Sequence, residues 1–242
     1  LRSQIPESRT QDNSNCYGIG MDPLNVGRSL FHLLLVVHIK FKITCSNIGF
    51  RKIVRTFLGT SVYKGDKIQP MIKIIVSTNR NNAVSSTIAK LYQEILAEKG
   101  AASEILYLAD LPADFTATAL YENNGKNPEF NAFHDRVKEG KKFVFIVPEY
   151  NGSFPGILKT FIDGMTYPNA FQNKKCALIG LSSGIGGGGI AMSHLTDIFH
   201  YLGMHVLALK PKLAKIEQNM SDNLLTNRLY VELLHTQADM LL

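Results

Sequence analysis

From residue 71 onward, short apolar runs alternate with amphipathic segments, and this alternation limits the folds open to the chain. Five apolar runs predict strands at 71–77, 103–108, 143–148, 176–181 and 205–209. Apolar residues at helical spacing predict helices at 84–99, 130–138, 156–165, 188–203 and 222–241. Strands that alternate with helices form a parallel sheet covered on both faces, and the runs FVFIV and ALIGL are as apolar as such buried strands require. We predict an α/β, doubly wound fold with a five-stranded parallel sheet.

Residues 1–70 differ from the rest in pattern and charge. They show no sustained helix or strand period, and they carry ten Lys and Arg against four Asp and Glu. Residues 71–242 carry sixteen of each, so the whole net charge of +6 lies before Met71. A nucleic-acid partner requires a basic face on the folded part, and we predict no such partner.

The same contrast predicts the domain organisation. We expect residues 1–70 to be an extension outside the functional fold and residues 71–242 to form the functional domain. One form of this hypothesis has Met71 as the natural start of the protein. A small accessory domain at 1–70 is the alternative.

The cysteines and the apolar runs indicate the cellular compartment of the protein. Cys16, Cys45 and Cys176 lie far apart without CxxC spacing, which argues against a disulfide framework or zinc site and for a reducing cytoplasm. Cys176 lies in an apolar run and is predicted to be a buried core thiol. The longest apolar run, 30–39, is about half the ~20 residues of a membrane helix, and it begins too deep in the chain for an ordinary signal peptide. We predict a cytoplasmic protein without a membrane span.

The loop after the first predicted strand, STNRNNAVSSTIA at 77–89, is rich in hydroxyls and amides and contains Arg80. The loops that follow strands 1, 3 and 4 of a doubly wound sheet meet at one edge, where such folds bind ligands. The free N–H groups and dipole of a helix N-terminus suit an anion. Phosphate binding and plain N-capping by Ser85, Ser86 or Thr87 both remain open for this loop.

The other two loops also place polar or flexible residues at strand tips. PEYNGSFP, at 148–155, puts several polar side chains before a helix that Pro155 opens at its first position; an ordinary polar loop is the alternative. The third loop fits GxGxxG at 184–189, but the tip of the next strand, Leu209-Lys210-Pro211, lacks the acid of a dinucleotide site. Its glycines would allow close approach of a ligand to the backbone.

Together these loops resemble the NAD(P)H-dependent FMN reductase family, within the flavodoxin-like fold. The string PEYNxSxPxxLKxxID at 148–163 is the most specific match. The first loop resembles the family's GSxRxxSxN phosphate loop, with Ser77 in place of Gly, Ala83 in place of Ser and Ser85 in place of Asn. The third resembles the family's SxGxxGG segment. A further departure is Gly164, where relatives often have an aromatic residue, and we expect it to alter the pocket floor or a subunit contact.

The resemblance implies strand order 2-1-3-4-5 and a non-covalently bound FMN. The flavin would accept hydride from NADH or NADPH and pass electrons to a small acceptor: a quinone, azo dye, metal oxyanion or free flavin. The flavin carries the chemistry, so no catalytic side chain and no metal are expected. The implied cofactor-binding residues are Ser77, Thr78, Arg80 and Ser85 for the phosphate; Pro148, Glu149, Tyr150, Asn151 and Ser153 for the ring; and Ser183, Gly184 and Gly187 in the third loop.

The Glu149 side chain is interpreted as a loop anchor rather than a proton donor. Relatives commonly form homodimers or homotetramers, and Phe115, Leu120 and Tyr121, in the irregular segment 110–128, are predicted to form an exposed rim or partner contact. Two alternatives to a reductase remain: a flavodoxin-like electron carrier, which would usually be strongly acidic, and a non-catalytic nucleotide-binding module.

Overall fold

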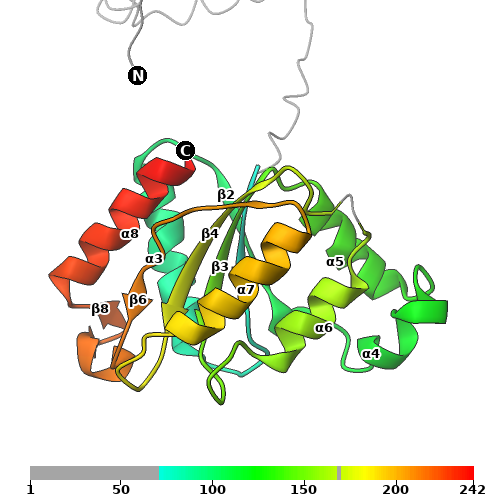
Figure 1. Cartoon of the computed structure of the whole chain (residues 1–242), viewed down its shortest axis with the longest axis horizontal. Helices are drawn as coiled ribbons and strands as arrows, with labels where there is room; N and C mark the ends of the chain where they lie inside the picture. Colours follow the sequence, from blue (N-terminus) through cyan, green and yellow to red (C-terminus); the bar gives the residue numbers. More distant parts are fainter. Residues whose placement is uncertain (1–70, 168–169) are drawn as a thin grey trace, which may run out of the picture. The chain divides into compact units, whose positions relative to one another are not determined.

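A parallel sheet forms the centre of the described domain (Figure 1). The computed structural model describes residues 71–167 and 170–242, so the predictions for residues 1–70 lie outside the described residues. The main sheet has the order β2-β1-β3-β4-β5, and every pairing in it is parallel. Its strands are β1 (Ile72–Val76), β2 (Ser103–Tyr107), β3 (Lys142–Pro148), β4 (Lys175–Leu181) and β5 (His205–Val206). The predicted strand order is confirmed.

Helices cover both faces of this sheet, as predicted (Figure 1). Along β3, Phe143 and Phe145 pack in one core cluster, whereas Val144 and Ile146 pack in the other, because neighbouring side chains of a strand point to opposite faces. The first cluster includes residues of α5 (Pro128–Lys138), α6 (Gly156–Gly164) and α7 (Gly189–Tyr201). The second includes residues of α3 (Val84–Glu98) and α8 (Arg228–Leu241).

The irregular segment after β2 folds into the core. It forms η1 (Leu108–Asp110), α4 (Phe115–Thr118) and η2 (Tyr121–Asn123). Phe115 stacks on Phe130 with ring centroids 5.5 Å apart, and both Phe115 and Leu120 are buried. The prediction of an exposed rim is therefore wrong for these two residues, because they cover the aromatic core of α5; Tyr121 alone is exposed, at 80%.

Gly164 explains how closely this segment packs. A Cβ on Gly164 would lie 2.6 Å from the Phe130 ring and 2.8 Å from a Leu120 methyl group. An aromatic side chain cannot occupy this position without displacing both neighbours. The departure at Gly164 thus serves core packing against the segment that follows β2.

The predicted strand at 205–209 is shorter in the structure. β5 ends at Val206, and the chain pairs with β4 again only at β6 (Lys212–Leu213). Between them, the Gln237 side chain of α8 donates hydrogen bonds to the carbonyls of Leu178 and Leu209, at 2.9 and 2.8 Å. A side chain from a distant helix therefore satisfies carbonyls in the interval between the two strands.

The last helix begins later than predicted. A two-stranded hairpin, β7 (Met220–Ser221) and β8 (Leu224–Leu225), follows the short helix η3 (Ile216–Asn219). Asp222 and Asn223 adopt φ values of 48° and 60°, the left-handed conformations that a tight hairpin turn requires. Asn227 then accepts a hydrogen bond from the Tyr230 N–H and caps α8.

Cys176 is fully buried in β4, which confirms the predicted core thiol. Desolvation raises its pKa well above the usual value for a thiol, so it stays protonated. Within 71–167 and 170–242, no helix combines the length and apolar character needed to cross a bilayer.

Candidate active site

The loop after β1 leads to a helix N-terminus with no side-chain cap. Asn82 turns the chain with a φ of 54°, and Ala83 is the N-cap residue of α3. Alanine has no side-chain acceptor, so no side chain caps the first N–H groups of α3. The alternative of capping by Ser85, Ser86 or Thr87 is wrong, because these residues lie within the helix. The helix dipole and these N–H groups favour an anion at this end.

A side-chain contact joins the first loop to the second. The Thr78 hydroxyl lies 2.8 Å from the Tyr150 hydroxyl, and it also accepts a hydrogen bond of 3.2 Å from the Arg80 N–H. Beneath it, the buried Ser77 donates its N–H to the Ile146 carbonyl of β3 at 3.1 Å. Ser77 and Thr78 therefore fix the loop to the neighbouring strand and its loop.

The second loop is a tight hairpin. Tyr150 and Ser153 exchange two backbone hydrogen bonds of 2.8 and 3.0 Å, and Asn151 and Gly152 form the turn with φ values of 51° and 75°. The Ser153 hydroxyl lies 2.9 Å from Nδ1 of His194 on α7. The hairpin is thus held on one side by Thr78 and on the other by His194.

Glycines let the third loop pack closely against β4 and β6. A Cβ on Gly180 would lie 2.5 Å from the Gly187 carbonyl, and Gly187 itself has a φ of 56° and abuts the backbone of Lys212. The Ser182 hydroxyl accepts the Gly187 N–H at 2.9 Å and donates to the Gly184 carbonyl at 3.1 Å. These contacts hold the backbone of residues 182–188 in one conformation.

A cleft of about 360 Å³ opens at the carboxyl ends of the strands, where the three loops meet. Six of the sequence-predicted residues line it: Arg80, Ser85, Pro148, Glu149, Tyr150 and Ser183. Six do not: Ser77 and Thr78 are buried, Asn151 and Ser153 belong to the hairpin, and Gly184 and Gly187 belong to the third loop. The predicted convergence of loops therefore occurs, with half of the predicted residues at the cleft surface.

Sequence reasoning missed the contribution of η3. Ile216 and Glu217 line the cleft, and Glu217 accepts a hydrogen bond of 2.7 Å from the Ser183 hydroxyl. Asn82 also lines it. The available signal was positional, because residues 210–221 follow the last predicted strand and hence lie at the same sheet edge as the three loops.

The charges in the cleft are mixed. Among the described lining residues, Arg80 is the only Lys or Arg, and Glu149 and Glu217 are the carboxylates. The Glu149 N–H donates to the Leu181 carbonyl at 2.9 Å, whereas its carboxylate makes no hydrogen bond with any described residue. Its side chain is therefore not the predicted loop anchor; its backbone performs that role.

The residues present fit a ligand that carries an anionic group such as a phosphate. The uncapped N-terminus of α3 lies beside Arg80, so the donors suited to an anion are concentrated at one end of the cleft. In the third loop, a Cβ on Gly184 would meet no atom within 4 Å. Protein packing therefore does not require glycine at this exposed position.

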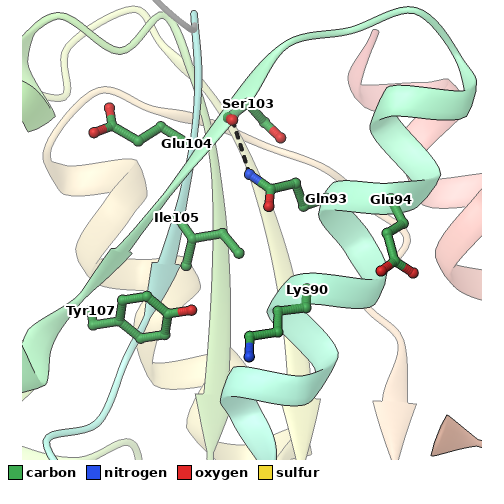
Figure 2. A pocket seen from close by; sticks show the side chains of 7 residues that line it. All are labelled: Lys90, Gln93, Glu94, Ser103, Glu104, Ile105 and Tyr107. Atoms are coloured by element: carbon green, nitrogen blue, oxygen red, sulfur yellow. Dashed lines mark hydrogen bonds between the residues drawn. The ribbon is translucent and has the colours of Figure 1, made fainter.

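A larger hollow of about 690 Å³ lies elsewhere, between α3 and the edge strand β2 (Figure 2). Figure 2 shows Gln93 reaching from α3 to donate a hydrogen bond to the Ser103 carbonyl, at 3.0 Å. No sequence-predicted site residue lines this hollow. In the described part of the chain, no group of three or more His, Cys, Asp or Glu residues could hold a metal.

The reversal of strand order beside β1, with a cleft at the carboxyl ends of the strands, defines a doubly wound α/β protein of the flavodoxin type. A family model described as NADPH-dependent FMN reductase matches residues 70–213. The chain belongs to this family, an enzyme family whose members use FMN and NAD(P)H. Family membership favours the reductase interpretation over the electron carrier and the non-catalytic module.

Relatives agree with this assignment, and a solved structure agrees with the fold. The chain is 31% identical over 142 residues to an NAD(P)H:quinone oxidoreductase from Solanum tuberosum, covering 57% of this chain and 73% of the relative. It is 26% identical over 183 residues to an NADPH:quinone oxidoreductase from Arabidopsis thaliana, covering 71% and 93%. The fold is similar to that of FerB, a flavoenzyme NAD(P)H:(acceptor) oxidoreductase from Paracoccus denitrificans, with a TM-score of 0.55, 24% identity and coverage of 70% and 93%. Ile216 and Glu217 lie beyond the residues that the family model matches.

Proposed function

We propose that the chain holds FMN in the cleft at the carboxyl ends of the strands and there transfers electrons from NAD(P)H to a small acceptor of the quinone type. The observation that carries this proposal is the convergence of the uncapped α3 N-terminus, Arg80 and the Tyr150 hairpin on one cleft. The names of the plant relatives, both quinone oxidoreductases, favour a quinone over the other acceptors.

The two ends of the cleft have different tasks in this proposal. The N–H groups of α3, Arg80 and Ser85 bind the phosphate, whose charge the helix dipole and the guanidinium stabilise. Pro148, Glu149 and Tyr150 line the space for the ring, and the hairpin that carries Asn151 and Ser153 limits its position. The third loop, with Ser183, Gly184 and Gly187, approaches the ring through its backbone.

FMN supplies the redox chemistry when it is bound. The residues of this chain bind it and orient it, and the fixed N–H dipoles of tight loops stabilise negative charge without reorganisation. Thr78 and His194 keep the hairpin in place. No side chain is assigned to proton transfer.

Spectroscopy of the purified chain tests the proposal directly. We expect FMN absorbance bands after reconstitution, loss of the oxidised bands when NADH or NADPH is added without oxygen, and their return when a benzoquinone is added. Steady-state rates with both nucleotides, against a quinone, an azo dye, chromate and free flavin, then rank the acceptors. Bound FMN that neither nucleotide reduces would identify an electron carrier instead.

We further propose that the protein is cytoplasmic and forms a homodimer or homotetramer. The spacing of the three cysteines supports a reducing compartment. The exposed side chains of Tyr167 and Tyr201 stack with their ring centroids 6.3 Å apart and offer apolar surface for a subunit contact. Sedimentation of the FMN-loaded protein at several concentrations tests the assembly, and a monomer throughout would contradict it. Fractionation of the source cells tests the location.

A further inference from the structure

The helix α7, which lies along one face of the sheet, has an exposed outer side (Figure 1). Its inner side packs in the first core cluster through the buried residues Ala191, Met192, Leu195 and Phe199. On its outer side, the large hydrophobic residues Ile190 and Tyr201 are 57% and 79% exposed. The exposed His194 and Asp197 lie between them.

These four exposed residues form one stripe along the helix. Their spacings are four, three and four residues, so at 3.6 residues per turn they lie within about 60° of one another around the helix axis. This is the spacing with which two helices pack nearly parallel or antiparallel. The stripe reads the same in both directions, because a large hydrophobic residue stands at each end and a pair of polar, titratable residues stands in the middle.

A stripe with this symmetry is complementary to a second copy of itself. In a two-fold dimer the same surface of both subunits meets, so residue i contacts residue j of the partner and residue j contacts residue i. An axis that passes between His194 and Asp197 makes the two α7 helices antiparallel. It sets Ile190 against the partner's Tyr201, and His194 against the partner's Asp197. Each of these contacts then occurs twice in the dimer.

The polar groups of the stripe are available for such a contact. His194 and Asp197 are one turn apart on α7, yet neither forms an ion pair with any described residue. Nδ1 of His194 lies 2.9 Å from the Ser153 hydroxyl. When that hydroxyl donates to Nδ1, the neutral imidazole carries its proton on Nε2, which can donate to a carboxylate.

We propose that two copies of the chain associate through antiparallel α7 helices, with Ile190 on the partner's Tyr201 and His194 on the partner's Asp197. Each His194 then has a partner at both ring nitrogens, so the partner's Asp197 is a positioning residue for the hairpin that carries Ser153. This geometry rests on the homodimer of the proposed function, and its effect on the hairpin rests on the proposed FMN site.

Sedimentation of two charge variants of the full chain tests the interface. His194→Glu sets two carboxylates against each other, and Asp197→Lys leaves the partner's His194 facing a cation. We expect the dimer dissociation constant of each variant to rise at least about tenfold. Glu94→Lys makes the same change of charge at an exposed position of α3, whose buried residues belong to the other core cluster, and should sediment like the parent.

The result for the parent separates this geometry from the proposed assembly. A parent that sediments as a monomer overturns both. A parent and variants that dimerise equally well overturn the α7 geometry alone, because the dimer would then use another surface.

A mixture of the two variants tests the antiparallel register. In a mixed dimer the introduced glutamate faces the introduced lysine, and the second pair is the native contact of His194 with the partner's Asp197. We expect the mixture to dimerise nearly as tightly as the parent, although each variant alone does not. Variants that stay monomeric after mixing, with circular dichroism that matches that of the parent, overturn the pairing.

Titration with FMN tests the link to the hairpin. Asp197 does not line the cleft, so its effect on FMN must pass through the partner's His194. We expect Asp197→Lys to raise the Kd for FMN roughly threefold, and the parent to show the same rise when it is diluted below its dimer dissociation constant. An unchanged Kd in both cases overturns the positioning role. A parent that binds no FMN overturns the proposed function instead and leaves the sedimentation results in place.

Discussion

At the level of single residues, the contact between Tyr150 and Thr78 joins two loops of the cleft through one hydrogen bond of 2.8 Å. We predict that Tyr150→Phe keeps the ring and its packing but releases the hairpin from the first loop. The net value of such a bond is about 1 kcal/mol, so the Kd for FMN should rise roughly threefold to tenfold. Fluorescence titration with FMN measures this change. Tyr121→Phe, at an exposed position outside the cleft lining, should leave the Kd unchanged.

Tyr92 presents the opposite case, a hydroxyl that no described residue satisfies. The side chain is fully buried, and its hydroxyl has no hydrogen-bond partner among the described residues. Desolvation, reinforced by the charge of Asp239, raises the pKa of this phenol above its usual value. We predict that Tyr92→Phe stabilises the protein by about 1 kcal/mol, since it removes a desolvated polar group without leaving a cavity. Urea unfolding measures the change.

Tyr230 provides the matched control for that substitution. Its hydroxyl donates to the Ala214 carbonyl at 3.3 Å, so Tyr230→Phe should destabilise the protein by about 0.5–1 kcal/mol. Destabilisation by Tyr92→Phe of the same size would show that the Tyr92 hydroxyl has a partner, such as a buried water.

At the level of elements, two glycines near the third loop separate folding from ligand binding. A Cβ on Gly180 of β4 would collide with the Gly187 carbonyl, whereas a Cβ on Gly184 would meet nothing. We predict that Gly180→Ala costs about 1–3 kcal/mol through overpacking, and that Gly184→Ala changes stability by less than about 0.5 kcal/mol. Thermal unfolding of the FMN-free variants distinguishes the two positions.

The Gly184 substitution also tests the position of the flavin. We predict that Gly184→Ala weakens FMN binding even though it leaves the fold intact, because in the proposed function the flavin approaches the backbone of the third loop, where the new methyl group would obstruct it. Equilibrium titration with FMN gives the affinity. An affinity equal to that of the parent would mean that this part of the third loop does not approach the flavin.

The elements also show what the sequence could and could not predict. Strands and helices were predicted because buried strands are continuously apolar and helices keep their period. The cleft was predicted because each loop motif consists of residues that are neighbours in sequence, and because the three loops follow strands of one parallel sheet. The interval between β5 and β6 could not be predicted, since the Leu178 and Leu209 carbonyls there bond Gln237 from a distant helix. The burial of Phe115 and Leu120 depends likewise on Phe130 and on the space that Gly164 leaves.

At the level of the whole molecule, the ion pairs of Glu104 join β1, β2 and α5. Glu104 of β2 contacts the fully buried Lys73 of β1 at 2.6 Å and Arg136 of α5 at 2.7 Å. Desolvation alone would raise the pKa of Glu104, but the hydrogen bonds and charges of Lys73 and Arg136 outweigh it and lower the pKa. This network therefore makes the stability of the fold depend on pH.

The sign of that dependence follows from the lowered pKa. A carboxylate whose pKa is lower in the folded state stabilises the fold above its unfolded pKa, about 4.3 for Glu. The stabilisation is lost as the pH falls through that value toward the folded pKa. We predict that Glu104→Gln lowers the free energy of unfolding at pH 7 by about 2 kcal/mol, less than for a fully buried pair because Glu104 is partly exposed. The variant should also lose less stability than the parent between pH 5 and about pH 3.

Urea unfolding at a series of pH values measures both effects in one experiment. Glu94→Gln is the matched control, because Glu94 is exposed on α3 and forms no ion pair with a described residue. It should follow the parent at every pH. If Glu104→Gln also ran parallel to the parent, Lys73 would not need this carboxylate, and Glu139, 3.8 Å from Lys73, would suffice to balance the buried charge. Since a buried ammonium left with one distant, exposed partner is costly, we expect the two curves to converge as the pH falls.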